Sequence, residues 1–186
     1  MKRFLLITAF LLCCLIAGAQ RTSRGMGEIT LTAGSTLSHW GGELTYGKYL
    51  MSSYWFGGVA FHNRFERDIP SGEKIHFPRL EARGGMLYRL LSSYNRAMSL
   101  YVGGDVFLGV EMLDLYGTLT EPVRRSLLNN GYKPYQFIYG TAPRVELELF
   151  LSPSFALVAG GRAPLTFGTR FPLLGWEFSA GGRLNF

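Results

Sequence analysis

The last thirteen residues of the chain alternate between apolar and polar positions. Counting back by twos from the final residue, one face carries Phe186, Leu184, Gly182, Ala180, Phe178 and Trp176, and the other carries Asn185, Arg183, Gly181, Ser179 and Glu177. This period of two is typical of a strand with one apolar and one polar face. A soluble sandwich buries such an apolar face against a second sheet, whereas a membrane barrel turns it outward to lipid. The number of similar segments decides between the two.

The same alternation recurs in seven upstream segments. The predicted strands cover residues 28–34, 42–50, 54–66, 78–90, 98–112, 135–151 and 155–167, the last of them less regular, with Pro164 near its end. Together with the terminal segment they give eight strands of roughly ten residues or more, the length that crosses a bilayer at a tilt. The pattern therefore predicts an all-β fold, an eight-stranded antiparallel up-and-down transmembrane β-barrel.

The connections between these strands alternate between longer and short. Short turns are expected near Ser52, Asn95 and Pro153, and longer loops near Ser38, Ser71, Asn129 and Arg170. A barrel with an even number of strands has short turns at the periplasmic rim and larger loops at the outer rim. We therefore expect both termini in the periplasm. The longest irregular segment, residues 113–134, has enough apolar side chains to be ordered, either as a lid over the mouth or docked on a partner.

The N-terminus has the pattern of a secretory signal peptide. Lys2-Arg3 precedes a nearly unbroken apolar run from Phe4 to Ile16, which Ala17-Gly18-Ala19 follows as a cleavage site. The run is too short for a membrane anchor, since the hydrocarbon core is about 30 Å thick. We predict a signal peptide over residues 1–19 and an outer-membrane β-barrel over residues 20–186. Both cysteines lie in the predicted signal, so a disulfide, thiol nucleophile or cysteine-metal site is not expected in the mature chain.

The charge is mildly basic and scattered. The whole chain has 19 basic and 13 acidic residues, a formal charge of +6, and removal of Lys2 and Arg3 with the signal leaves 17 against 13, or +4. No basic run with interleaved aromatic residues is present, so direct nucleic-acid binding is not predicted.

Charged residues gather on the predicted inward faces. The lumen of an eight-stranded barrel is just wide enough for side chains to fill, and a buried charge without a partner is costly. Nine acids face seven arginines there, close to balance, and the interpretation favoured is a packed core of ion pairs. A proton or ion pathway is the alternative, and no feature of the sequence supports it. The acids are Glu28, Glu43, Glu66, Glu81, Asp105, Glu111, Glu146, Glu148 and Glu177, and the arginines are Arg64, Arg79, Arg83, Arg89, Arg144, Arg162 and Arg183.

From these sets a lumen charge network is predicted, with Phe186 as the assembly signal of the terminal strand. The network comprises Glu81, Arg83, Asp105, Glu111, Arg144, Glu146, Glu148, Arg162, Glu177 and Arg183. None of the three histidines, His39, His62 and His76, lies in a hydrolase or zinc-protease motif. We therefore predict no catalytic, cofactor-binding or metal-ligating residue and no cofactor. His62 is expected to join the lumen network, and His39 and His76 to contribute rim polarity.

Several short segments together resemble the conjugative transposon TraO family of Bacteroidetes. They are Gln20-Arg21 with Gly25-Met26, Ala82–Tyr88, Leu108–Glu111, Phe137–Gly140, Glu146–Glu148 and the Gly-x-x-x-x-Phe ending. The resemblance covers nearly the whole mature chain, although Thr22 stands where relatives often have a cysteine. It implies a part in conjugal DNA transfer through a type IV secretion apparatus.

The partners implied by these observations are outer-membrane lipid, the barrel-assembly machinery and other proteins of the conjugation apparatus. The alternative is a general small OmpA/OmpX-like barrel for adhesion, defence or envelope stability. The sequence alone does not separate the two, and the presence or absence of conjugation genes beside this gene would discriminate between them.

Overall fold

A computed structural model describes residues 25–35, 39–67, 74–93, 97–113, 120–129, 133–169, 171 and 173–186. The predicted signal peptide, and several loop residues, lie outside these ranges. The signal peptide therefore stays a prediction.

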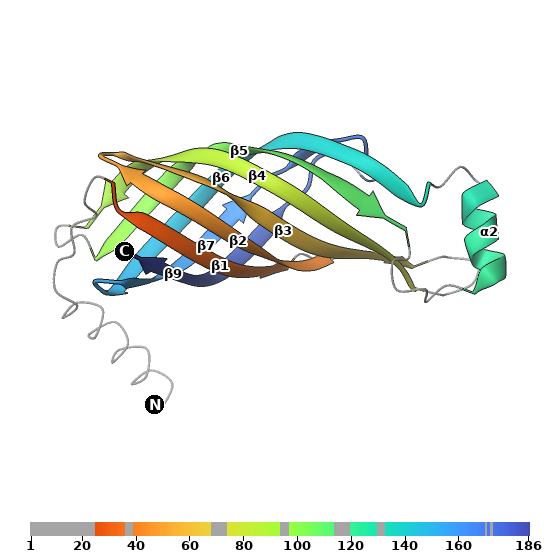
Figure 1. The fold of residues 1–186 in the computed structure, drawn as a ribbon, viewed down its shortest axis with the longest axis horizontal. Helices are drawn as coiled ribbons and strands as arrows, with labels where there is room; N and C mark the ends of the chain where they lie inside the picture. The colour runs from red at the N-terminus through yellow and green to blue at the C-terminus, as the bar shows by residue number, and fades with distance from the viewer. Residues whose placement is uncertain are drawn as a thin grey trace, which may run out of the picture.

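Nine strands form one antiparallel sheet that closes on itself (Figure 1). The hydrogen-bonded order is β5-β4-β3-β2-β1-β9-β7-β6-β8, and a further pairing of β5 with β6 completes the ring. The predicted closed eight-stranded antiparallel barrel is confirmed, with one short additional strand. The strands are β1 (Gly27–Ser35), β2 (His39–Leu50), β3 (Ser53–Arg67), β4 (Lys74–Ser92), β5 (Met98–Met112), β6 (Tyr135–Ser152), β7 (Phe155–Arg162), β8 (Leu165–Phe167) and β9 (Glu177–Asn185).

The additional strand arises because the seventh predicted strand is interrupted. β7 and β8 both pair with β6, one after the other along its length. Pro164 lies between them and has no N–H group to donate to a ladder. Beyond Pro164, β8 pairs with β6 again. Residues 173–175 add two hydrogen bonds on the other side: the Thr166 amide donates to the Leu173 carbonyl at 2.8 Å, and the Gly175 amide donates to the Pro164 carbonyl at 3.0 Å. The prediction of one continuous strand over 155–167 was therefore wrong at this point, and the last strand begins at Glu177.

We call the end of the barrel that holds the C-terminus, at the left in Figure 1, the lower end. The opposite end, at the right beside α2, is the upper end. The three lower connections are the short ones that were predicted: residues 51–52, 93–97 and 153–154. At the upper end, the β1–β2 connection is only residues 36–38, shorter than the turn at 93–97. The predicted alternation of loop lengths is wrong there, because pairing of Ser35 with Trp40 extends both strands into the segment assigned to a loop.

The irregular segment 113–134 contains an α-helix, α2 (Glu121–Asn129), which the sequence analysis did not predict. Pro122 occupies its first turn, where a missing N–H costs nothing, and Glu121 is acidic at the N-terminal end, where the helix dipole favours negative charge. The helix lies beyond the upper end of the barrel (Figure 1). Within the residues described, no helix is long and apolar enough to cross a membrane.

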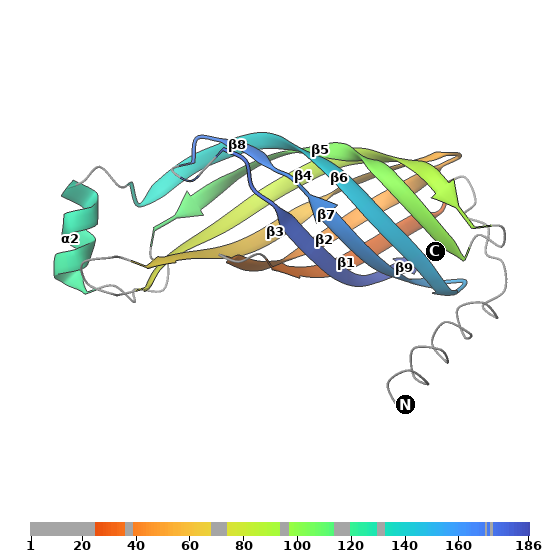
Figure 2. The same ribbon diagram turned by 180° about the vertical axis from the view of Figure 1, so that it is seen from behind.

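The wall of the barrel has unequal height. β4 and β6 have 19 and 18 residues, whereas β1 and β9 have nine each. Figures 1 and 2 show β3 to β6 continuing toward α2 past the upper ends of β1 and β9. The wall of the barrel is therefore shorter on the side of β1 and β9, which we call the low side, than on the side of β4 and β6.

The outer surface of the wall is apolar and the inner surface polar. Leu31 on β1 and Val106 on β5 are 63% and 65% exposed, while Glu28 and Glu81 are fully buried in the lumen. Aromatic rings gather on the outer surface at two levels. Near the lower end Tyr46 contacts the rings of Trp55 and Phe186 at 6.5 Å, and higher up Trp40 meets Phe61 at 6.0 Å.

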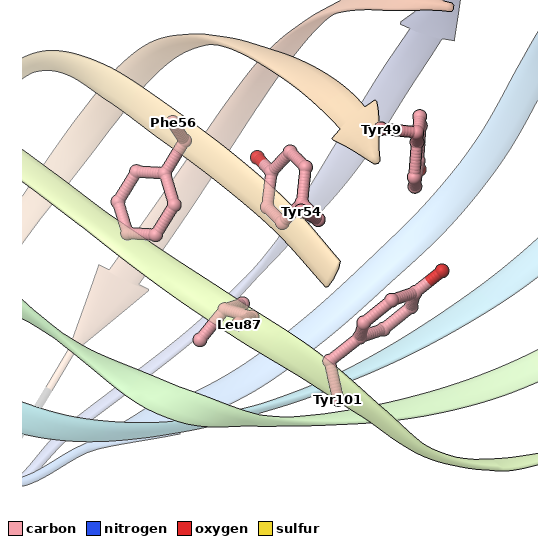
Figure 3. Close-up of a cluster of buried hydrophobic side chains, with 5 residues drawn as sticks. All are labelled: Tyr49, Tyr54, Phe56, Leu87 and Tyr101. Atoms are coloured by element: carbon pink, nitrogen blue, oxygen red, sulfur yellow. The ribbon is translucent and has the colours of Figure 1, made fainter. Parts of the chain in front are cut away.

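Apolar clusters occupy both ends of the lumen. The lower cluster consists of Tyr49, Tyr54, Phe56, Leu87 and Tyr101, with Met26 packed against it (Figure 3). The upper cluster is built on Ile75 and Phe77 of β4, against which Leu113, Leu127 of α2 and Phe171 pack. The Phe171 ring meets Phe77 edge-on at 5.0 Å. Polar residues of the lumen therefore lie between two apolar layers.

Candidate functional site

The lumen between the two apolar clusters holds a network of arginines and carboxylates. Its residues occupy inward positions of strands around the ring, which alternation along each strand places there. The network divides into a lower group around Arg183 and an upper group around Arg83, Arg144 and Arg162.

Arg183 of β9 is fully buried and contacts three carboxylates. Its Nε lies 2.5 Å from Glu28, its Nη2 2.6 Å from Glu146 and its Nη1 3.0 Å from Glu148. Nε also donates to Thr30 Oγ1 at 2.8 Å. This single guanidinium therefore joins β9 to β1 and to β6.

Tyrosines of the lower apolar cluster complete the coordination of Arg183. The Tyr54 hydroxyl donates to Glu28 at 2.5 Å, and the Tyr49 hydroxyl donates to Glu148 at 2.5 Å. Both hydroxyl oxygens also accept from Arg183, which stacks over the Tyr54 ring at 4.7 Å. The lower group thus merges with the apolar cluster beneath it, because Tyr49 and Tyr54 have their rings in the cluster and their hydroxyls bonded to the charged group.

In the upper group, Glu43 of β2 bridges two arginines. One of its oxygens accepts from Arg144 at 2.8 Å and the other from Arg83 at 2.8 Å. Arg83 also pairs with Glu81 at 2.7 Å. Arg144 reaches Glu146 at 3.2 Å, which links the upper group to Arg183.

Arg162 of β7 completes the upper group. It binds Asp105 with two nitrogens, Nε at 3.0 Å and Nη2 at 2.7 Å, and binds Glu177 through Nη1 at 2.8 Å. Its guanidinium also lies 4.7 Å from the Phe107 ring centroid. Arg79 pairs with Glu81 at the upper edge of the network and donates to Thr166 at 3.4 Å.

The structure brings nine of the ten predicted network residues into one connected set, and Glu28, Glu43 and Arg79 from the wider inward set join them. Glu111 lies higher, opposite Arg79 across the β4–β5 ladder, and accepts a hydrogen bond from Thr169 at 3.1 Å. Arg89 lies at the lower rim, where it donates to the Met51 carbonyl at 2.7 Å. Arg64 stacks over Phe171 at the upper end, and the side chain of Glu66 is not among those described.

Sequence reasoning missed the tyrosines of the network. Tyr49 and Tyr54 are aromatic and were not counted with the inward polar residues. Their positions in the alternation were a usable signal, because residues an even number apart on a strand share a face. Tyr49 lies six residues after Glu43 on β2, and Tyr54 lies eight residues before His62 on β3, so both face inward.

The histidines take structural positions. His62 Nε2 lies 2.5 Å from an Arg83 nitrogen, so it joins the network as expected. His76 Nδ1 lies 3.3 Å from the Asn63 amide nitrogen, and His39 begins β2. In the part of the chain that is described, no three histidine, cysteine or acidic side chains gather as a metal site requires.

We expect the purified barrel not to conduct ions as a porin does. Among the described residues, an apolar cluster lies at each end of the lumen and paired charges occupy the space between them, an arrangement that opposes a continuous water path. Planar-bilayer recordings of the folded protein should show no large, stable unit currents under conditions in which a porin, recorded in parallel, gives them. Large and stable currents would contradict a plugged lumen.

Comparison with known proteins gives one family and several barrels. The family model described as conjugative transposon protein TraO matches residues 20–186. No curated protein matches significantly. Among solved structures, Neisserial surface protein A has a TM-score of 0.57 and 13% identity, over 87% of this chain and 95% of that one.

Two further barrels illustrate the same fold. The N-terminal β-barrel domain of Pseudomonas aeruginosa OprF has a TM-score of 0.53 and 12% identity, over 88% of this chain and 98% of that one. The attachment invasion locus protein Ail of Yersinia pestis, in complex with the heparin analogue sucrose octasulfate, has a TM-score of 0.52 and 13% identity, over 88% of this chain and all of that one. At such identities the likeness concerns the fold.

Proposed function

We propose, from the premise that this chain belongs to the conjugative transposon protein TraO family, that it is an outer-membrane barrel of a conjugative DNA-transfer (type IV secretion) apparatus and acts through protein contacts. The family match over residues 20–186 is the observation that carries the proposal. We propose no catalytic role. Three features of the barrel support the proposed outer-membrane role. They are the outer wall, the orientation of the barrel and the upper rim.

The outer wall has the dimensions of a lipid-facing surface. On β3, Trp55 and Phe65 are both exposed and lie ten residues apart. Ten residues of strand span roughly 34 Å, and a tilt of about 40° reduces this to roughly 26 Å along the barrel axis. That height agrees with the apolar band of about 25 Å between the aromatic girdles of outer-membrane barrels. Lys48, which shares the outward face near the lower end, can extend toward the interface.

The lengths of the connections support an orientation. Outer-membrane barrels have short periplasmic turns and longer extracellular loops. The short turns lie at the lower end with the C-terminus, and α2 lies at the upper end (Figure 1). We therefore place the lower end in the periplasm and the upper end outside the cell.

The upper rim is the surface we assign to partner proteins. Side chains occupy the lumen and the outer wall faces lipid, so the two rims are the surfaces left for contact with partner proteins. Leu127 anchors α2 to the upper apolar cluster, while Arg124, Arg125 and Leu128 on the same helix are exposed. An anchored helix with an exposed mixed surface is suited to a protein contact.

Replacing residues 115–132 by a short Gly-Ser linker should lower conjugal transfer frequency to the level of a strain that lacks the gene, while the barrel still folds. The barrel is expected to fold because its strand pairings and charge network lie outside the replaced segment. Transfer is measured by mating, and folding by heat-modifiable mobility of the outer-membrane protein. A matched control replaces Pro153-Ser154 in a lower turn.

Normal transfer by the linker variant with a folded barrel would exclude α2 as the contact and direct attention to the lower turns. Normal transfer by the strain without the gene would reject the conjugation role itself. In that case the alternative, a general barrel for adhesion, defence or envelope stability, becomes the better explanation.

A further inference from the structure

Three large apolar side chains are exposed together at the lower rim of the barrel. Met51 is 71% exposed, Leu90 60% and Leu91 63%. Met51 belongs to the turn between β2 and β3, and the two leucines lie near the end of β4. This turn and the end of β4 are in direct contact, because the Arg89 amide donates to the Ser52 carbonyl at 2.8 Å and its guanidinium donates to the Met51 carbonyl at 2.7 Å. We call the side chains of Met51, Leu90 and Leu91 the rim patch.

A β-bulge places both leucines on the outside of the barrel. The pairing of β4 with β5 shifts between Arg89 and Leu91, so Leu90 is an extra residue with no residue opposite it on β5. Strict alternation from the buried Leu87 would turn Leu91 into the lumen. The bulge turns it outward instead, so that two consecutive leucines lie on one surface.

The backbone at Met51 is unusual as well. Of the residues described, Met51 is the only one besides glycines with a positive φ, which is 23°. Glycine and asparagine adopt positive φ more readily, and a larger side chain at such a position costs free energy. The exposed Met51 side chain does not recover this cost by packing inside the barrel. Its retention at the turn therefore indicates a contact outside the barrel.

The rim patch lies below the apolar band of the outer wall. Trp55, which belongs to the lower level of outward aromatic rings, pairs with Met86 on β4, and Leu90 follows Met86 by four residues. Four residues of strand span roughly 13 Å, or about 10 Å along the barrel axis at a tilt of about 40°. The sideways step of about 4.8 Å from β3 to β4 offsets roughly 3 Å of this height at the same tilt. The patch is therefore roughly 7–10 Å below Trp55, outside the hydrocarbon that covers the wall.

We propose that the rim patch inserts into an apolar pocket of a periplasmic partner protein, an inference that rests on the proposed function, which places this rim in the periplasm. Grouped apolar side chains outside lipid mark a protein contact. A second copy of the barrel would stand beside the first in the same membrane, whereas Met51 lies at the tip of a lower turn. Three side chains supply much less than the roughly 800 Å² that each partner buries in a stable complex. They are therefore the anchor of a larger interface over the lower rim.

Single cysteines test what covers the patch, because both cysteines of the sequence lie in the predicted signal peptide. In lipid nanodiscs, which leave both rims open, Leu91→Cys should react with a charged maleimide at least about tenfold faster than Leu108→Cys on the outer wall, since hydrocarbon excludes a charged reagent. In permeabilised donor cells, Leu91→Cys should be protected when the other transfer genes are present and reactive when they are absent. Slow labelling in nanodiscs would assign the patch to lipid. Protection without the other transfer genes would assign it to a second copy, and reactivity with them would exclude the partner.

Two variants test the patch in conjugal transfer. Leu90→Ser combined with Leu91→Ser should lower transfer frequency by at least about tenfold, because burial of each leucine strengthens a contact by roughly that factor. Met51→Asn removes the apolar side chain but tolerates positive φ, so it should fold at least as well as the unsubstituted chain and also lower transfer. Pro153→Ser, at an exposed residue of a different lower turn, is the matched control.

Heat-modifiable mobility shows which variants fold, and Met51→Asn decides the matter if the double serine variant does not. Normal transfer by a folded variant, in a strain whose transfer is lost when the gene is deleted, would overturn the rim patch and leave the proposed function standing. Normal transfer after deletion of the gene would instead reject the proposed function, and the partner with it.

Discussion

Replacing Arg183 by alanine should destabilise the barrel by at least about 3–5 kcal/mol, the range observed when one partner of a buried ion pair is removed. The loss falls at the upper part of this range or beyond it because Arg183 neutralises more than one group. Glu28, Glu146 and Glu148 all contact it, and none of them is more than 1% exposed. After the substitution Glu146 keeps Arg144, whereas Glu28 and Glu148 have no other arginine partner among the described residues.

The measurement is urea unfolding of the protein refolded in lipid vesicles, followed by heat-modifiable mobility. Arg183→Lys keeps a positive charge but loses the planar fork, so it should recover only part of the stability. Arg125→Ala is the control, because the Arg125–Glu121 pair lies on the exposed surface of α2 and its loss should not change barrel stability measurably. An Arg183→Ala barrel as stable as the unsubstituted protein would show that the lower group is neutral without its arginine.

Deleting Phe186 should remove most of the folded protein from outer-membrane fractions. The backbone of this residue closes the ring: its amide donates to the Gly27 carbonyl at 3.0 Å, and its carbonyl accepts from the Gly27 amide at 2.9 Å. Its ring lies 6.5 Å from that of Tyr46. The deletion therefore weakens the junction of the first and last strands, in addition to removing the terminal aromatic residue proposed as the assembly signal.

Heat-modifiable protein in outer-membrane fractions is the quantity to compare. Phe178→Ala is a matched control, since Phe178 lies on the same strand and the same outward face, with similar exposure, and is not terminal. Phe186→Trp should keep both the backbone pairing and an aromatic end, and should assemble nearly normally. Equal yields of folded protein from the deletion and the unsubstituted chain would mean that Phe186 has no part in assembly.

The outer wall could be predicted from the sequence because alternation determines it residue by residue. Leu80, Val106 and Leu184 are exposed where the pattern placed them. The interior was harder to predict. Charged residues indicated the network, but Tyr49 and Tyr54 look like lipid-facing residues by composition, and only their parity along the strand puts them inside.

The helix α2 and the break at Pro164 could not be obtained from alternation. Residues 121–129 have no period of two, and their helical order depends on Leu127 reaching Ile75 and Phe77, which lie some fifty residues earlier. Contacts between segments that distant in sequence are not visible in a local pattern. The interruption before β8 was signalled by Pro164, but the compensating hydrogen bonds from residues 173–175 were not.

The arginines that pair with carboxylates of more than one strand also determine how neighbouring strands align. A slip of two residues between neighbouring strands keeps every apolar side chain on the lipid side, so the outer pattern alone cannot distinguish the native pairing from its shifted alternatives. The paired charges inside the lumen do distinguish the native pairing from the shifted ones. Glu43 on β2 must meet both Arg83 on β4 and Arg144 on β6, and Arg183 on β9 must meet β1 and β6 together. A two-residue slip of any one of these strands would separate several pairs at once and leave buried charges unmatched, so the lumen selects one alignment from a set that the wall treats as equivalent.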